Sequence, residues 1–321
     1  MGMLVEGQWL DDDEARRSSA DGSFVRPASS FRDQVSIDGA SGFKAEPGRY
    51  HLFIARTCPW AHRTAIARRL KGLEDAVGIT FADLPRTQGW AAESGLDDLQ
   101  PVDGKFHLHR LYTTARADYT GRVTVPVLWD RQRRTIVNNE SAEILRIFNN
   151  GFGALAKNPQ DLYPEELRAQ IDETNTFVYE HVNNGVYRSG FARTQEAYET
   201  ACRKVFDGLD HLERRLAHER YLVGNRLTEA DVRLFPTLVR FEAVYYSHFK
   251  CNLRRLEDYP HLSGYLRDLY ARPAFGGTTD IGAIKRGYYG GQFNVNPTGI
   301  VPLGPRLDFM APHGRDALGP A

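Results

Sequence analysis

The feature that most constrains the fold is a short apolar segment that passes directly into a helix through a cysteine and a proline. Residues 50–56, YHLFIAR, are rich in strand-forming side chains. From Pro59 the sequence WAHRTAIARRLKGL places apolar residues at helical spacing. Proline is tolerated in a first helical turn, because its missing N–H would have no partner there. The segment therefore predicts a strand, a tight turn and a helix with Cys58 at its N-terminus.

The segments that follow extend this unit into an α/β domain. Residues 78–84 predict the next strand, and residues 123–130 and 135–150 predict two more strands and a helix capped around Asn139. Strand, helix, strand, strand, strand, helix is the plan of a thioredoxin-like domain. The stretch between its second and third strands, residues 85–122, is long and polar. Loops without structure that exceed ~12–15 residues are uncommon and often functional. We expect part of this stretch to cover a binding site.

The second half of the chain is predicted to be helical. Thr228 and Asp231 form an N-cap box ahead of an apolar run. Apolar periodicity predicts helices over residues 164–183, 194–219, 228–247 and 260–271. We therefore expect an N-terminal extension (1–46), a thioredoxin-like thiol-binding domain (47–155), an all-helical domain (156–275) and an irregular Gly/Pro-rich tail (276–321).

Composition excludes several function classes. The 41 basic and 41 acidic residues give a net charge of zero, which argues against a nucleic-acid partner. No window approaches the ~18 consecutive apolar residues of a membrane span, so no membrane partner is expected. Three cysteines form no disulfide framework, which favours a reducing, cytoplasmic location. His107 and His109 lack further ligands at metal spacing, so we predict a structural role for them and no metal.

Cys58 is the strongest candidate for chemistry. Free amides and the helix dipole stabilise an anion at a helix N-terminus, and cysteines placed there can be thiolates at neutral pH. His62 and Arg63 add positive charge nearby. Ala61 occupies the place of a second cysteine in a C-x-x-C motif. A thiol from outside the chain must therefore resolve any disulfide that Cys58 forms.

Two further segments fit a thiol-bearing peptide as ligand. In thioredoxin-like domains an X-Pro bond at the start of the third strand is cis, and Val125-Pro126 occupies that position. The backbone of Val125 would then pair with an extended peptide. Glu140 and Ser141 open the next helix and suit the ammonium and carboxylate of a γ-glutamyl group. Plain helix capping is the alternative role for this last pair.

Taken together, these motifs resemble a known family. TCPWAHR, VTVPVLWD, NNESAEI, NNGVYRSGFA, RFEAVY with HFKCN, IKRGYYG and NPTGIVPLGP occur in the order and spacing of the glutathionyl-hydroquinone reductases, the Xi-class glutathione transferases. The match runs from about residue 30 to residue 305. It implies a glutathione transferase architecture, with a thioredoxin-like domain before an all-α domain. It also implies a homodimer.

The resemblance assigns roles to residues of this sequence. Cys58 matches the catalytic nucleophile, and Tyr187 matches a tyrosine proposed to protonate the departing hydroquinone. Tyr245 and Tyr288, rather than their neighbours Tyr246 and Tyr289, match tyrosines that shape the quinol pocket and tune the acid. The positions that match glutathione-binding residues are Trp90, Arg122, Val123, Thr124, Val125, Glu140 and Ser141.

The resulting hypothesis is a glutathione-dependent reductase that converts S-glutathionyl-hydroquinones to hydroquinones through a Cys58–glutathione mixed disulfide. One alternative is an omega-like thioltransferase or dehydroascorbate reductase, which would use Cys58 but not the tyrosines. The other is a non-catalytic thioredoxin-like interaction module with an unreactive Cys58. The sequence leaves open the physiological quinol. It also leaves open whether the thiol is glutathione or a γ-glutamyl relative.

Overall fold

The computed structural model describes residues 2–11 and 19–319. The chain divides into two compact units, unit 1 (Met1–Arg17 and Pro27–Gln160) and unit 2 (Ser18–Arg26 and Asp161–Ala321). Within the described ranges, no helix is both long and apolar enough to cross a membrane. The division at residues 46, 155 and 275 that the sequence suggested stays a prediction.

The centre of unit 1 is a mixed sheet with the strand order β10-β9-β5-β6. β5 runs parallel to β6 and antiparallel to β9, which pairs antiparallel with β10. The bounds are β5 (Tyr50–Ile54), β6 (Val77–Phe81), β9 (Val127–Asp130) and β10 (Thr135–Asn138). β9 is buried along its whole length, and Leu52 and Phe53 of β5 are fully buried, as their apolar runs require. These strands confirm the predicted order.

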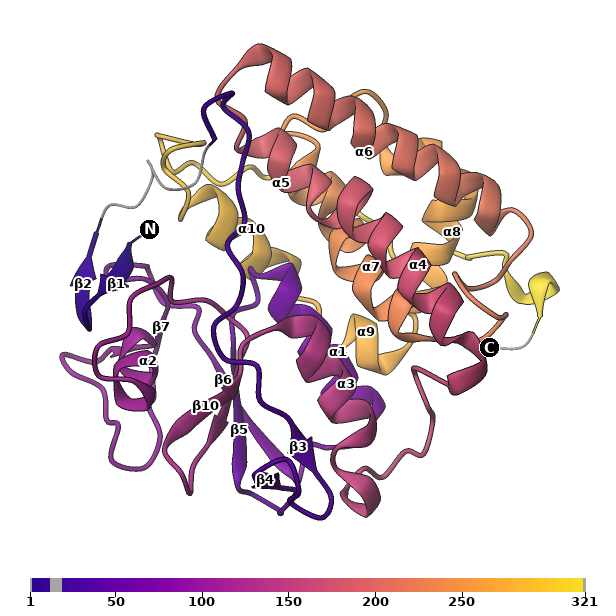
Figure 1. Cartoon of the computed structure of the whole chain (residues 1–321). Helices are drawn as coiled ribbons and strands as arrows, with labels where there is room; N and C mark the ends of the chain where they lie inside the picture. Colours follow the sequence, from indigo (N-terminus) through magenta and orange to yellow (C-terminus); the bar gives the residue numbers. More distant parts are fainter. Residues whose placement is uncertain (1, 12–18, 320–321) are drawn as a thin grey trace. The chain divides into compact units, whose positions relative to one another are not determined.

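Helices cover both faces of this sheet (Figure 1). α1 (Pro59–Leu70) and α3 (Ser141–Asn150) pack against each other on one face, and α2 (His109–Ala115) lies on the other. Ile66 of α1 and Ile144 and Leu145 of α3 are fully buried, so the apolar stripe of each helix forms the core. The α/β fold class predicted for this half is confirmed.

Two local predictions for unit 1 were wrong. The segment 85–122 is not a structureless loop, because it contains β7 (Ala91–Ala92), β8 (Phe106–His107) and α2. Leu111 and Tyr112 of α2 are fully buried, so this short helix is held by packing that periodicity over seven residues does not reveal. The helix α3 is capped by Glu140 and not by Asn139, whose side chain bonds elsewhere.

The residues before β5 belong to the packing of unit 1. Phe31 and Val35 are buried, and the Asp33 N–H donates to the Val137 carbonyl of β10 at 3.0 Å. Short strands occur at β1 (Met3–Val5), β2 (Gln8–Leu10), β3 (Val35–Ser36) and β4 (Phe43–Lys44). This stretch therefore contributes buried apolar side chains at both ends of α3, with Phe31 next to its start and Val35 next to its end.

Unit 2 is helical, as predicted. Its main helices are α4 (Arg168–Val178), α5 (Gly185–Gly190), α6 (Gln195–Leu216), α7 (Glu229–Arg240), α8 (Pro260–Tyr270) and α9 (Pro273–Gly276). α5 packs along α6, and α7 packs against α4 and α8 (Figure 1). The predicted capping box opens α7, where the Thr228 N–H donates to the Asp231 carboxylate at 2.8 Å. Two π-helical turns, Tyr179–Asn183 and Phe241–Tyr245, extend α4 and α7.

The tail after residue 276 is only partly irregular. It contains α10 (Ile281–Tyr289), which the glycine content of the segment concealed. Asp280 caps this helix by accepting a hydrogen bond from the Ala283 N–H at 2.8 Å. Packing of Ile284, Tyr288 and Tyr289 into unit 2 then compensates for the poor helix propensity.

Candidate active site

Cys58 lies where the sequence placed it, as the N-cap residue of α1 with Pro59 in the first turn. Its side chain is buried, with 8% of its surface exposed. The thiol donates to the Val125 carbonyl, with 3.6 Å between Sγ and oxygen. The Val125-Pro126 peptide bond is cis, as predicted. The cysteine therefore faces the backbone segment to which the sequence assigned peptide binding.

Two cationic or titratable side chains follow Cys58 on α1. His62 and Arg63 are both buried. The Arg63 guanidinium lies over the Trp60 ring at 4.6 Å and donates to the Ser141 hydroxyl at 3.5 Å. Because Ser141 is the first residue of α3, this guanidinium links the beginnings of two helices. The positive ends of both helix dipoles and one buried cation thus occur in one part of unit 1, an arrangement that favours an anionic ligand.

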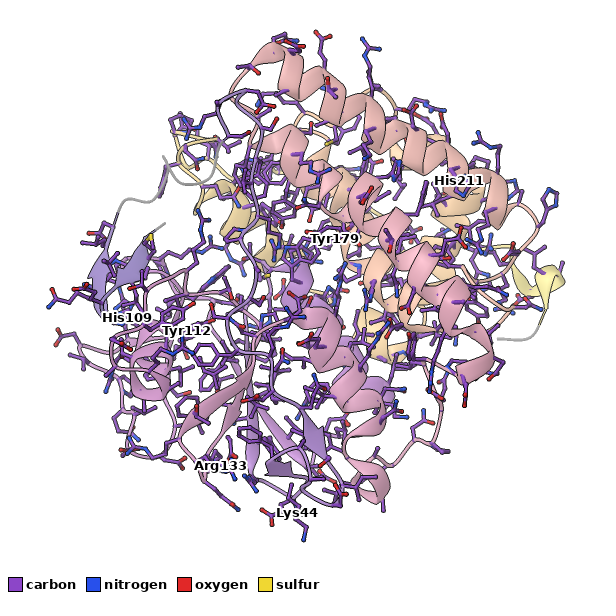
Figure 2. All side chains as sticks on the ribbon, in the orientation of Figure 1. Lys44, His109, Tyr112, Arg133, Tyr179 and His211 are labelled. Carbon is purple, nitrogen blue, oxygen red and sulfur yellow. The ribbon has the colours of Figure 1, made fainter. Side chains whose placement is uncertain are left out.

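The segment before Pro126 is held by Tyr112, which sequence analysis missed. Its hydroxyl donates to the Thr124 carbonyl at 2.9 Å and accepts from the Thr124 N–H at 3.1 Å. The Asn139 amide donates to the same hydroxyl at 3.2 Å. Figure 2 labels Tyr112 together with its neighbour His109 on α2. Burial raises the pKa of Tyr112 to about 12, so it stays a neutral donor.

Glu140 and Ser141 stand at the N-terminus of α3, as predicted. The Glu140 carboxylate accepts from the Ala142 N–H at 3.2 Å and from the Ser29 hydroxyl at 2.9 Å. Glu140 remains partly exposed, whereas Ser141 is buried. The carboxylate therefore serves as a cap and also presents negative charge that an ammonium group could meet.

The remaining predicted glutathione-binding residues are Trp90 in the segment before α2, and Arg122 and Val123 directly before Thr124. Trp90 is half-buried, with the Arg86 guanidinium 3.7 Å from its ring centre. Val123 is buried, and the Arg122 carbonyl accepts from the Tyr119 hydroxyl at 3.2 Å. The Tyr119 and Tyr112 hydroxyls thus hold the carbonyls of Arg122 and Thr124. The order of the chain alone could not reveal these contacts.

The tyrosines singled out from the sequence come together in unit 2. The Tyr187 and Tyr288 hydroxyl oxygens lie 2.5 Å apart, and those of Tyr245 and Tyr288 lie 3.1 Å apart. Tyr288 is therefore the centre of a chain of three hydroxyls from α5, a π-helical turn and α10. The neighbour Tyr289 instead bonds to the Ser247 hydroxyl and the Ala243 carbonyl.

The environment of these hydroxyls keeps them protonated. Tyr245 and Tyr288 are almost fully buried and Tyr187 retains 9% exposure. Burial first, and then the neighbouring phenols, raise the pKa of Tyr288 well above its usual range. A chain of buried neutral phenols can donate a hydrogen bond or a proton at its more exposed end, which is Tyr187.

No group of three or more His, Cys, Asp or Glu side chains able to hold a metal occurs within residues 2–11 and 19–319. His107 and His109 instead stack on each other, with ring centres 5.5 Å apart. Cys202 and Cys251 are buried thiols, and burial raises the pKa of Cys251 to about 12.

The fold, and the cysteine at the N-terminus of α1, are those of a glutathione transferase. Family models for the N-terminal and C-terminal domains of glutathione S-transferase match residues 57–150 and 195–268. The glutathione-bound structure of YqjG from Escherichia coli K-12 superposes with a TM-score of 0.87 and 44% identity, covering 98% of this chain and 99% of that one. A Xi-class structure from Natrialba magadii gives a TM-score of 0.89 at 44% identity, covering 99% and 97%.

Comparison with known protein sequences identifies the family within the glutathione transferases. The glutathionyl-hydroquinone reductase PcpF of Sphingobium chlorophenolicum is 50% identical over 308 residues, which cover 95% of this chain and 96% of that protein. The chain belongs to the glutathionyl-hydroquinone reductases, the Xi-class glutathione transferases, and is an enzyme of that family.

Proposed function

We propose that this enzyme uses glutathione to reduce S-glutathionyl-hydroquinones, with Cys58 as the nucleophile. The observation that carries the proposal is the Cys58 thiol at the N-terminus of α1, 3.6 Å from the carbonyl before a cis-proline. The family relationship supplies the substrate class, since the relative PcpF is named for this reaction. The tyrosine hydroxyl chain supplies a proton source suited to a phenolic product.

In the first half-reaction the Cys58 thiolate attacks the glutathionyl sulfur. A sulfur–sulfur bond forms, the bond from sulfur to the ring carbon breaks, and its electron pair stays on the ring. The ring carbon then takes a proton, for which we propose Tyr187 as donor. The products are the hydroquinone and a Cys58–glutathione mixed disulfide.

In the second half-reaction a glutathione thiolate attacks the glutathione sulfur of the mixed disulfide. Oxidised glutathione leaves, and the Cys58 thiolate is regenerated. Ala61 stands where a resolving cysteine would be, which is why the reaction needs an external thiol. The net change is conjugate plus glutathione to hydroquinone plus oxidised glutathione.

The residues of unit 1 fit glutathione as the thiol. We propose that the backbone of Val125 pairs with the cysteinyl part of glutathione, as the cis-proline geometry allows. Glu140 would meet the γ-glutamyl ammonium, and Ser141 with the amides of α3 would meet its carboxylate. Trp90, Arg122, Val123 and Thr124 would complete this site.

Steady-state kinetics test the proposal. Two successive thiol steps predict parallel double-reciprocal lines for conjugate and glutathione. Cys58→Ser is expected to abolish turnover while glutathione binding and the fold persist. Cys202→Ser, which alters a buried thiol of unit 2, is the matched control. Near-normal turnover in Cys58→Ala would disprove the role of Cys58.

The tyrosines distinguish this activity from plain thiol transfer. Tyr187→Phe is expected to slow hydroquinone release and to leave reduction of dehydroascorbate or of a small disulfide unchanged. Unchanged rates on both substrate types would instead favour the omega-like thioltransferase, and equal losses on both would show that Tyr187 has a structural role.

Two family features complete the proposal. We propose a homodimer in the cytoplasm, as the resemblance and the low cysteine content led us to expect. Light scattering on the purified protein tests the first point, because a dimer of a 36.3 kDa chain has twice that mass. A mass that stays at one chain across micromolar concentrations would contradict it.

A further inference from the structure

One buried hydrogen bond ties the end of α10 to the segment that follows the π-helical turn. The His248 Nε2 and Gln292 Oε1 atoms lie 3.0 Å apart, and both side chains are buried. An amide oxygen only accepts, so the histidine nitrogen carries the proton. Burial lowers the pKa of His248, which keeps the imidazole neutral at neutral pH.

Both residues of this hydrogen bond contact Tyr288. The Gln292 N–H donates to the Tyr288 carbonyl at 3.1 Å, so the glutamine continues from the last turn of α10. On the other side, the His248 ring packs at 6.1 Å from the Tyr288 ring and 4.6 Å from the Tyr289 ring. The backbone and the ring of Tyr288 are therefore both in contact with the bonded pair.

The loop that carries His248 is itself firmly held. Its neighbour Phe249 packs between the three reactive tyrosines, at 5.4 Å from Tyr245, 5.3 Å from Tyr187 and 5.7 Å from Tyr288. The Phe249 carbonyl accepts from the Ser189 hydroxyl at 3.2 Å. This loop is thus a fixed support to which the His248–Gln292 bond connects α10.

Tyr288 can move only slightly before its hydroxyl loses a hydrogen bond. Its hydroxyl must stay within hydrogen-bond distance of two other hydroxyls, at 2.5 Å and 3.1 Å, and these come from different segments. A shift of α10 by about an ångström would take the longer contact beyond the range of a hydrogen bond.

We propose that His248 and Gln292 are a positioning pair for hydroquinone release, which hold Tyr288 in the hydroxyl chain that delivers the proton. Neither side chain acts on the substrate itself. The inference rests on the proposed function, because it assigns the pair to the proton-transfer half of that reaction. The thiol exchange at Cys58 does not depend on it.

The test compares two substrates for each variant. Gln292→Leu removes the acceptor, His248→Phe keeps a ring but removes the donor, and His248→Gln retains an N–H donor. Glutathionyl-menadiol reports hydroquinone release, and bis(2-hydroxyethyl) disulfide reports thiol exchange. Ser247→Ala, which breaks the adjacent bond from the same loop to Tyr289, is the matched control. Thermal unfolding of each variant measures folding.

Gln292→Leu and His248→Phe are each expected to slow menadiol release by about tenfold, the value of one buried hydrogen bond. The disulfide rate should stay near that of the wild type, the double variant should be no slower than either single one, and His248→Gln should recover part of the rate. Ser247→Ala should resemble the wild type on both substrates.

Two results would overturn the inference. Menadiol release at the wild-type rate in Gln292→Leu would show that the bond does not position Tyr288. Equal loss of both activities would show a general structural role. If His248→Phe does not fold, the Gln292→Leu result decides alone. A wild-type enzyme that exchanges disulfides but releases no menadiol would refute the proposed function itself, which separates the two failures.

Discussion

At the scale of single residues, the Tyr112 hydroxyl fixes the backbone on which the proposed glutathione site depends. It bonds both the N–H and the carbonyl of Thr124, one residue before Val125. Tyr112→Phe leaves these groups without that partner, so we expect glutathione binding to weaken by about 1 kcal/mol, roughly fivefold in Kd. Calorimetric titration with glutathione measures this. Tyr50→Phe, which loses a 2.7 Å bond to the Lys44 carbonyl, is the matched control and should bind normally.

At Gly190 we expect a larger side chain to destabilise the protein through crowding, and not through the loss of a hydrogen bond. Alanine in place of a helical glycine usually stabilises by up to about 1 kcal/mol. Here the added Cβ would lie 2.2 Å from the Phe249 ring, and such overpacking costs about 1–3 kcal/mol. Because the cost of overpacking exceeds the gain in helix propensity, Gly190→Ala should lower the midpoint of chemical unfolding. It should also slow hydroquinone release, since Phe249 is displaced. In Gly282→Ala the new Cβ meets only the ends of two flexible side chains, Arg286 at 3.1 Å and Asp280 at 3.3 Å, so that variant should be neutral or more stable.

A residue whose role depends on its neighbours in the sequence could be predicted, whereas a residue whose role depends on contacts with distant parts of the chain could not. Cys58 is recognisable because strand, cysteine, proline and helix follow one another directly. The sequence predicts a helix cap around Asn139, yet the Asn139 side chain accepts from the Phe31 N–H and donates to the Tyr112 hydroxyl. Those partners are 108 and 27 residues away, a separation that no local pattern encodes. The pair Asn138-Asn139 ahead of a helix was the one available signal.

At the scale of elements, the pairing of β5 with β6 encloses a histidine. His51 bonds the Thr80 hydroxyl at 2.8 Å and lies against Gly78, where any Cβ would clash with its ring. Burial, with Arg131 and Arg68, lowers the pKa of His51 from 6.5 to about 4. The unfolded chain therefore binds a proton between these values that the folded one does not, so the free energy of unfolding falls as pH drops through this window.

Urea unfolding across this range checks the effect. His51→Gln keeps a donor for Thr80 but has no imidazole, so its disadvantage relative to the wild type should shrink between neutral pH and about pH 4.5. His218→Gln, at an exposed histidine, should show no such convergence. A constant difference between wild type and His51→Gln at all pH values would contradict the assignment.

The helix α10 shows why element prediction failed in the tail. Its glycines lower intrinsic helicity, and its stability comes from a cap at Asp280 and from buried tyrosines. The longer helices α6 and α7 were predictable, because their apolar periodicity extends over several turns. Tertiary packing therefore stabilises α10, the helix that brings Tyr288 into the hydroxyl chain.

At the scale of the whole molecule, buried arginines hold the C-terminal residues to unit 2, and one of them, Arg315, belongs to those residues. Arg315 has 2% exposure and donates to the Leu216 carbonyl at the end of α6 and to the Arg220 carbonyl, each at 3.0 Å. Arg315→Ala leaves these carbonyls without that donor, so we expect a loss of about 2–4 kcal/mol in unfolding free energy. Arg306→Ala, in an exposed part of the same tail, should change it by less than about 0.5 kcal/mol.

Denaturant unfolding followed by circular dichroism compares the two arginine variants. If Arg315→Ala unfolded at the wild-type midpoint, the Arg315 hydrogen bonds would contribute nothing to the stability of unit 2. The fold class was predictable from the order of strands and helices, whereas this anchoring joins residues 95 and 99 positions apart and was not.

The most direct test of the central claim is intact-protein mass spectrometry after mixing the enzyme with glutathionyl-menadiol in the absence of free glutathione. The account predicts one glutathione adduct that maps to Cys58, formed in step with menadiol release and cleared when glutathione is added. Cys58→Ser should remain unmodified and release no menadiol. Menadiol release without an adduct, or an adduct on Cys202 or Cys251, would contradict a mechanism through a Cys58 mixed disulfide.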